Sequence, residues 1–278
     1  MIGIFDSGIG GLTVFKEIAR LLPDYDLAYF GDMARLPYGT RTKETITRYA
    51  KEVTAFLINQ GAKIIIVACN SATANALPAL QQEFPALPVL GVIVPAVEAA
   101  LAVSKHKIIG VVGTRATVTS GAYAREIFKR DALVRVKQQA CPLLVPLIEE
   151  GWTNKLETRR ISKTYLLPLK HAQIDTLILG CTHYPLIKPI FKSLMGNKVA
   201  IIDSAAATAH KLREYLLNHA QLAASLSRKG KREFYVTDAA ARFTAFAKRF
   251  LGPQFSQATL LDLAALETSS KSIPLSIG

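Results

Sequence analysis

Short apolar runs and longer amphipathic segments alternate along this chain. Ile2–Phe5, Leu27–Phe30 and Ile64–Ala68 have the length and composition typical of buried strands. Between them, the spacing of apolar residues predicts helices over Leu12–Leu21 and about Thr42–Gln60. Further expected elements are a helix around Ala72–Phe84 and strands at Val89–Val92, Lys107–Val112, Thr176–Leu179 and Val199–Ile202. Strands that alternate with helices predict an α/β fold with mainly parallel sheets.

Two stretches in different halves of the chain follow the same plan. Residues 63–71 form a β-branched run that ends in Cys69 and polar side chains, and residues 175–183 repeat this order around Cys181. We therefore expect two pseudo-symmetric α/β domains. Ligands of open α/β sheets bind beyond the carboxyl ends of the strands, so both thiols are expected to face one cleft between the domains.

The two cysteines at matching strand ends are the main candidates for chemistry. A free cysteine is most often buried and structural, and Cys141, which lacks such a setting, is interpreted in that way. A thiolate and a thiol on opposite sides of one carbon can remove a proton from one face and return one to the other. We expect Asp6 and His183 to tune the pKa values of these thiols toward neutrality. The alternatives are a helix cap for Asp6 and a surface loop residue for His183.

The turn Asp6–Gly11 is rich in glycine but does not match a nucleotide-binding loop. Thr13 stands where the dinucleotide pattern needs a third glycine, and no Gly-Lys-Ser/Thr follows. A backbone turn of this kind can still hold a carboxylate. Pro37–Gly39 is a second turn, and it is expected to leave the hydroxyl of Tyr38 exposed.

Composition narrows the classes of function. Of 278 residues, 50% are hydrophobic and 20% are charged, as in ordinary globular proteins. No apolar run approaches the roughly 20 residues of a membrane span, and the N-terminal residues do not resemble a signal peptide. Three cysteines are too few for a disulfide framework. We expect a cytoplasmic protein with reduced thiols and without bound metal.

The formal net charge of +13 allows two interpretations. It attracts polyanions nonspecifically, which keeps a basic nucleic-acid-binding protein as an alternative from a different class. The densest cluster, Arg228–Arg232, is interpreted as a solvated loop outside the cleft, because no aromatic stacking motif accompanies it. A basic surface also attracts an acidic substrate.

Four motifs, taken in order, resemble those of the bacterial glutamate racemases, which belong to the aspartate/glutamate racemase superfamily. The motifs are Ile4–Gly11, Leu36–Gly39, Cys69–Thr73 and Gly180–Pro185, and the similarity runs from residue 2 to about residue 204. The resemblance implies a cofactor-independent cytoplasmic enzyme that interconverts L- and D-glutamate and supplies D-glutamate for peptidoglycan. It also implies a substrate site between two domains, residues 1–95 plus 208–278 and residues 96–207.

The resemblance also implies roles for individual residues. Cys69, supported by Asp6, would deprotonate D-glutamate, and Cys181, supported by His183, would deprotonate L-glutamate. Glu149 matches the second assisting carboxylate of the family, with the adjacent Glu150 as the alternative. The implied substrate contacts are Asp6, Ser7, Tyr38, Gly39, Asn70, Ser71, Thr182 and His183, with Thr114 and Thr117 as additions.

The motifs leave the acidic substrate open, because they do not show where its distal carboxylate is held. The nearest alternative is a racemase of aspartate or another acidic amino acid that uses the same two thiols. A small-molecule substrate is the expected partner, without a membrane and without specific nucleic-acid binding. The resemblance further implies a homodimer.

Overall fold

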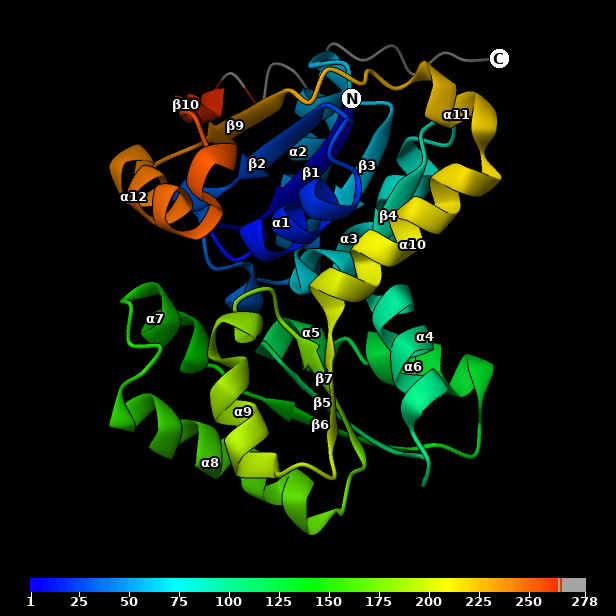
Figure 1. Cartoon of the computed structure of the whole chain (residues 1–278), viewed down its shortest axis with the longest axis vertical. Helices are drawn as coiled ribbons and strands as arrows, with labels where there is room; N and C mark the ends of the chain where they lie inside the picture. The colour runs from blue at the N-terminus through cyan, green and yellow to red at the C-terminus, as the bar shows by residue number, and fades with distance from the viewer. Residues whose placement is uncertain (265, 267–278) are drawn as a thin grey trace.

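Two parallel sheets with helices on both faces make up the computed structural model, which describes residues 1–264 and 266 (Figure 1). The first sheet has the strand order β10-β9-β2-β1-β3-β4, and the second has the order β6-β5-β7-β8. The strands are β1 (Ile2–Asp6), β2 (Leu27–Gly31), β3 (Ile64–Val67), β4 (Val89–Gly91), β5 (Ile108–Gly113), β6 (Arg135–Ala140), β7 (Thr176–Gly180), β8 (Ala200–Asp203), β9 (Arg232–Val236) and β10 (Thr259–Leu260).

The two sheets repeat one topology. Four strands of the first sheet lie side by side in the order β2-β1-β3-β4, and those of the second in the order β6-β5-β7-β8. In both sheets, the first strand in the chain therefore lies between the second and the third, and the fourth lies beyond the third. All neighbouring strands in both sheets are parallel. The prediction of two related α/β units with parallel sheets is confirmed. In such a sheet, the chain leaves the first and third strands in opposite directions, and a crevice opens at their carboxyl ends.

Helices cover both faces of the first sheet, because successive side chains of its strands point to opposite faces. Ile2 and Ile4 of β1 belong to the core on one face, and Phe5 belongs to the core on the other. The first face packs against α1 (Leu12–Leu21), α10 (Ser204–Asn218), α11 (Ala220–Ser225) and α12 (Ala240–Leu251), and the second packs against α2 (Lys43–Asn59) and α3 (Asn70–Glu83).

The second sheet is covered in the same way. Ile109 and Val111 of β5 face one core, and Val112 faces the other. The first core includes α4 (Ile93–Val103) and α6 (Ala122–Arg130), and the second includes α7 (Leu144–Glu149), α8 (Leu156–His171) and α9 (Lys188–Met195). The remaining helical segments are α5 (Arg115–Thr119), η1 (Met33–Arg35), η2 (Tyr38–Thr40), η3 (Tyr184–Ile187) and η4 (Gly252–Gln254).

The expected strands and helices of the first unit match the structure to within about two residues. The predicted helix at Thr42–Gln60 begins one residue later, because the Thr42 side chain caps it by accepting a hydrogen bond from the amide of Thr45. The strand β6, at Arg135–Ala140, was not predicted. It is a partly exposed edge strand whose sequence, RVKQQA, lacks an apolar run.

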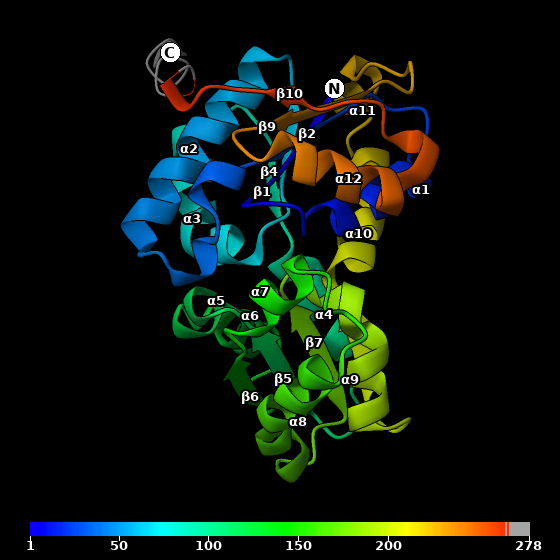
Figure 2. The same ribbon diagram turned by 90° about the vertical axis from the view of Figure 1, so that its left-hand side faces the viewer.

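The chain crosses between the two sheets twice, once after β4 into α4 and once from β8 into α10. Figure 2 shows the two lobes with α10 continuing from the lower one into the upper. We propose domain boundaries at 95/96 and 207/208, which fall within α4 and α10; the first domain's last residues lie beyond the described part of the chain. None of the helices in residues 1–264 and 266 combines the length and hydrophobicity of a bilayer-spanning segment.

Candidate active site

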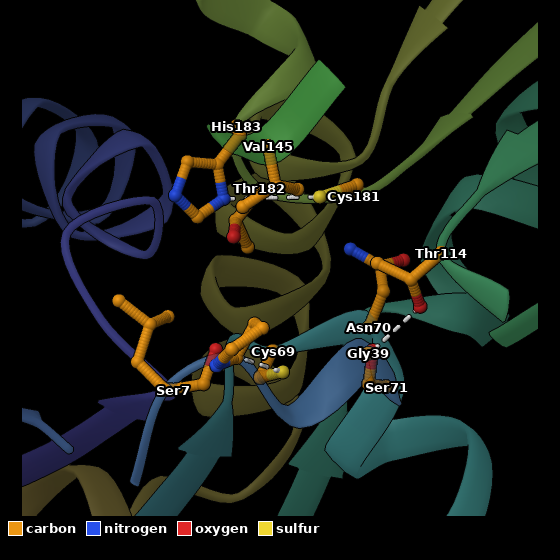
Figure 3. A pocket seen from close by; sticks show the side chains of 12 residues that line it. Ser7, Gly39, Cys69, Asn70, Ser71, Thr114, Val145, Cys181, Thr182 and His183 are labelled. Carbon is orange, nitrogen blue, oxygen red and sulfur yellow. Dashed lines mark hydrogen bonds between the residues drawn. The ribbon is translucent and has the colours of Figure 1, made fainter. Parts of the chain in front are cut away.

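A closed cavity lies where the carboxyl ends of the two sheets face each other. Cys69 follows β3 and Cys181 follows β7, the third strand of each unit. Both side chains line the cavity, come from opposite lobes and are 5% exposed (Figure 3). The other lining residues are Ser7, Leu36, Pro37, Gly39, Asn70, Ser71, Thr114, Val145, Thr182 and His183. The crevice predicted from strand topology therefore contains both thiols.

The sequence places Cys69 at the junction of a strand and a helix. The apolar strand β3 ends at Val67, and α3 begins at Asn70, with Cys69 in extended backbone geometry at the N-cap position. The carbonyl of Cys69 accepts a hydrogen bond from the amide of Thr73, and the first helical turn carries Asn70 and Ser71 into the cavity wall. Cys181 occupies the matching position between β7 and η3.

The environment of Cys69 keeps its thiol protonated. Burial, reinforced by the nearby negative charge of Asp6, raises the pKa of Cys69 to about 12. Its sulfur lies 3.7 Å from the hydroxyl oxygen of Ser7. The expectation that Asp6 would tune this thiol toward neutrality is wrong, because the charge of a carboxylate beside a thiol disfavours the thiolate and raises the pKa of Cys69.

Asp6 is fully buried at the end of β1, and the glycine-rich turn folds around its carboxylate. One carboxylate oxygen accepts hydrogen bonds from the amides of Gly8, at 3.1 Å, and Gly11, at 3.0 Å. The other lies 3.3 Å from the hydroxyl of Thr182, in the opposite lobe. Burial raises the pKa of Asp6. The turn does hold a carboxylate, but this carboxylate is the protein's own.

Cys181 belongs to a chain of three polar side chains. Its sulfur lies 3.8 Å from Nδ1 of His183, whose Nε2 lies 2.9 Å from Oε1 of Glu149. Burial alone would lower the pKa of His183, but its contacts with Cys181 and Glu149 raise it to about 10. An imidazolium stabilises a neighbouring thiolate. The histidine is 2% exposed, so the interpretation as a surface loop residue is wrong.

The structure distinguishes between the two adjacent glutamates on α7. Glu149 contacts His183, and its side chain is 11% exposed. The side chain of Glu150 is 69% exposed and pairs with Arg242 of α12 at 3.2 Å. The carboxylate that assists the histidine geometrically is therefore Glu149.

Hydroxyl and amide groups form the cavity wall opposite the Asp6 turn. The hydroxyls of Ser71 and Thr114 lie 2.8 Å apart across the two lobes (Figure 3), and Thr117, behind them, lies 3.1 Å from Thr114. The side-chain oxygen of Asn70 accepts a hydrogen bond from the hydroxyl of Tyr123 at 2.6 Å. The side-chain nitrogen of Asn70 is buried without a hydrogen-bond partner, which leaves a donor in the wall for a bound acceptor.

The prediction for Tyr38 needs correction. Tyr38 is fully buried, and its hydroxyl donates to the carboxylate of Asp32 instead of facing solvent. Burial raises the pKa of Tyr38 well above its usual value. The adjacent Gly39 does line the cavity, against Thr114 of the other lobe. Neither Tyr38 nor Thr117 is among the lining residues. Both support residues that do line the cavity, Gly39 and Thr114.

Sequence reasoning missed Asp32, which anchors this wall. It follows β2 as Asp6 follows β1, and its carboxylate accepts hydrogen bonds from Arg35, Tyr38 and Thr237. Arg35 also pairs with Glu52, so the turn before Gly39 is held by a buried ionic network. The missed signal was an acidic residue close to the end of a predicted strand, two positions after Phe30, whereas Asp6 directly follows the predicted strand Ile2–Phe5.

Comparison with known proteins places this geometry in a family. The model of the Asp/Glu/hydantoin racemase family matches residues 2–212. The chain belongs to this family. The resemblance found in the sequence is confirmed, and so is the expectation of an isomerase acting on an amino acid.

Relatives in this family are similar over nearly the whole chain. A glutamate racemase of Geobacter metallireducens is 46% identical and covers 95% of this chain and 97% of its own. A glutamate racemase of Aquifex aeolicus is 47% identical over 91% of this chain and 94% of its own.

Solved structures of relatives have the same fold. A glutamate racemase of Bacillus anthracis has a TM-score of 0.89 at 40% identity, covering 95% of this chain and 97% of its own. The glutamate racemase of Francisella tularensis, solved in complex with D-glutamate, has a TM-score of 0.87 at 37% identity and covers 95% of this chain and 98% of its own. The aspartate racemase of Picrophilus torridus, at 19% identity and a TM-score of 0.51, shares the fold alone.

Proposed function

We propose that this protein is a glutamate racemase, which interconverts L- and D-glutamate by proton transfer between two thiols and supplies D-glutamate for peptidoglycan. The observation that carries the proposal is the pair of cysteines at matching strand ends, which line one closed cavity from opposite lobes. The relatives of high identity that are named glutamate racemases support this choice of substrate over aspartate. The cytoplasm is the expected compartment, and a homodimer is the expected assembly.

The two thiols have complementary roles in the proposed reaction. Starting from L-glutamate, the thiolate of Cys181 takes the α-proton, and the thiol of Cys69 delivers its own proton to the opposite face of the carbanion. The reverse reaction exchanges the two roles. The protonated His183, held by Glu149, stabilises the Cys181 thiolate, while the raised pKa of Cys69 suits the acid of this direction.

D-glutamate requires the opposite protonation state, with Cys69 as the thiolate. Asp6 is the proposed base that accepts the proton of the Cys69 thiol. Burial raises the pKa of Asp6, which allows its carboxylate to take up this proton. The ammonium group of the substrate also brings a positive charge into the closed cleft, which lowers the pKa of any thiol beside it. The substrate ammonium therefore opposes the effects of burial and of the Asp6 charge on the pKa of Cys69.

Uncharged donors hold the substrate in this proposal. No arginine or lysine is among the described residues that line the cavity. The free side-chain nitrogen of Asn70 and the hydroxyls of Ser7, Ser71 and Thr182 are the donors for the carboxylates, and Gly39, Thr114, Thr117 and Tyr38 shape the wall that carries them. Such preorganised donors stabilise the carbanion in a dry site, where each hydrogen bond is stronger than in water.

The cleft has to open for each substrate molecule. The cavity volume is about 20 Å³, which is enough for about one water molecule and far too little for glutamate. The lobes meet through direct contacts, such as those of Thr182 with Asp6 and of Ser71 with Thr114. A movement of the two lobes about α4 and α10 is therefore part of the proposed cycle.

A circular-dichroism assay without added cofactor tests the substrate. The purified protein should remove the optical activity of L-glutamate and leave L-aspartate unchanged. Loss of the aspartate signal with a constant glutamate signal would reject glutamate as the substrate. The Cys69→Ser variant is the blank, because it lacks one of the two proton-transferring groups.

A further inference from the structure

Arg242 links the two lobes at the edge of the cleft. It lies on α12, which is fixed to the first sheet through Phe243, Ala247 and Leu251, all buried in its core. Its guanidinium reaches the other lobe and donates to the main-chain carbonyl of Glu149 at 2.8 Å and to the carboxylate of Glu150 at 3.2 Å. Both hydrogen bonds come from the same guanidinium nitrogen, Nη2, which therefore lies between the end of α7 and the Glu150 side chain.

The segment held by Arg242 carries parts of the active site. The short helix α7 contributes Val145 to the cavity wall and ends at Glu149, whose side chain contacts His183. The second carboxylate oxygen of Glu149 lies 4.0 Å from the guanidinium. One arginine on the first lobe therefore contacts both the backbone and the charge of the residue that orients His183.

Arg242 lies on the side of the cleft opposite the two chain connections between the lobes. The chain crosses between the lobes at α4 and α10, which lie on one side of the gap in Figure 1, whereas α12 and α7 lie on the other. A contact opposite the connections must break when the lobes separate. The guanidinium is 47% exposed, so solvent takes over its hydrogen bonds without leaving a buried charge.

We propose that Arg242 is an interdomain latch and positioning residue, which closes the cleft and at the same time sets Glu149 against His183. The effect of Arg242 on catalysis rests on the proposed racemase function. Its effect on closure of the cleft does not depend on that function. The groups that face the latch and its target are Glu149, Glu150, His183, Cys181 and Asp6.

Alkylation of the cysteines measures the latch without any racemase assay. Iodoacetamide reaches Cys69 and Cys181 only when the cleft opens, so their rates report the open population. Arg242→Gln should raise both rates about three- to tenfold, the range for losing partly exposed charged contacts. Cys141, buried in the core of the second lobe, should react as slowly as in the wild type.

Three further variants serve as controls. Arg249→Gln removes the same charge from the exposed side of the same helix and should leave all three rates unchanged. Arg242→Lys keeps the charge but replaces the planar guanidinium by a compact ammonium, and it should give an intermediate rate. Glu150→Gln weakens the latch from the other lobe and should also raise the rates of Cys69 and Cys181, by less than Arg242→Gln does.

Wild-type rates in Arg242→Gln would overturn the proposal. If Cys141 also reacts faster in Arg242→Gln, the whole fold has loosened in that variant. The Glu150→Gln variant then decides, and unchanged alkylation rates of its Cys69 and Cys181 would reject the latch. Failure of the wild type to racemise glutamate would refute the proposed function and leave these alkylation results valid.

The catalytic consequence has its own measurement. L- and D-glutamate have equal free energies, so kcat/KM must fall by one factor for both enantiomers in Arg242→Gln. We expect about three- to tenfold, with Arg242→Lys recovering part of the loss. An unchanged kcat/KM together with faster alkylation would remove the positioning role and overturn the proposal as stated.

Discussion

Cys69 and Cys181 illustrate how similar residues acquire different properties from their neighbours. Both follow a third strand, and both are 5% exposed. Cys69 faces the hydroxyl of Ser7 and the charge of Asp6, whereas Cys181 faces an imidazole that is itself held by a carboxylate. The two thiols therefore have different electrostatic surroundings: burial and Asp6 raise the pKa of Cys69, whereas Cys181 lies beside His183.

The two thiols are tested by replacing each with a hydroxyl. Cys69→Ser and Cys181→Ser should each lower kcat by at least about 10²–10⁴-fold, because a serine hydroxyl is far too weak an acid to transfer a proton at neutral pH. The folded state should persist, as measured by urea unfolding. Cys141→Ser is the matched control and should keep most of the activity. An inactive Cys141→Ser beside an active Cys69→Ser would refute the two-thiol mechanism.

The pair of His183 and Glu149 predicts a pH-dependent contribution to stability. The pKa of His183 is about 10 in the folded protein and near 6.5 in an unfolded chain. Its protonation therefore stabilises the fold fully below pH 6.5, and this stabilisation is lost as the pH rises through about 10. Glu149→Gln should lower the free energy of unfolding at pH 6 and change it much less at pH 10.

Urea unfolding of the two variants at both pH values measures this effect. Glu150→Gln is the control, because its exposed carboxylate does not contact His183. Equal destabilisation by Glu149→Gln at pH 6 and pH 10 would mean that His183 is not held as an imidazolium.

At the scale of elements, two turns allow the lobes to meet. A Cβ atom on Gly10 would lie 2.5 Å from Nδ1 of His183 and would also collide with the hydroxyl of Thr182, both in the opposite lobe. A Cβ atom on Gly39 would lie 2.6 Å from Cβ of Thr114. Gly10 in the turn after β1 therefore serves close packing between the lobes.

Gly10→Ala should reduce activity by blocking closure while leaving each lobe folded. We expect kcat/KM to fall by at least about tenfold, because a shift of the order of 1 Å at the reacting groups is costly. Gly61→Ala is the contrasting variant, since Gly61 has a φ of +86° and open space around it. It should lose about 1 kcal/mol of stability and keep its activity. Wild-type activity in Gly10→Ala would contradict the role of this turn in closure.

At the scale of the whole molecule, the basic cluster of residues 228–232 contains two kinds of side chain. Arg228, Lys229 and Lys231 are exposed, as expected for a solvated loop. Arg232 is half-buried, and its guanidinium donates to the carbonyls of Pro23, at 2.7 Å, and Tyr25, at 2.5 Å. The interpretation of the whole cluster as solvated is wrong for Arg232, which ties β9 to the turn before β2.

Neutralising the exposed members should leave catalysis unchanged. The triple variant of Arg228, Lys229 and Lys231 to Gln should keep kcat and KM at physiological salt, because charges beyond about 8 Å are screened there. Arg232→Gln should lower the free energy of unfolding by about 1 kcal/mol, since it removes hydrogen bonds from a charged donor to two main-chain carbonyls. Racemase kinetics and urea unfolding measure the two effects. A large loss of activity in a folded triple variant would place the cluster at the active site.

The sequence by itself determined most strands of both units, three helices of the first unit and the residues at the strand ends. Apolar runs of strand length, the repeat around Cys69 and Cys181, and the acidic residue after β1 were all visible, because each depends on local pattern. The parallel α/β class then followed, since strands separated by helices have few other arrangements. The edge strand β6 escaped because its burial is partial and its pattern polar.

The tertiary structure alone decided which polar groups meet. The contact of Glu149 with His183 and the reach of Arg242 from α12 to α7 join residues far apart in the chain, and the burial of Tyr38 against Asp32 depends on how the turn after β2 packs. The protonation states also belong to this level. A pKa depends on burial and on the charges around a group, and the neighbours that raise the pKa of Cys69 come from another strand end. Local pattern carries no record of such distances, because they arise only when strands, turns and lobes pack against one another.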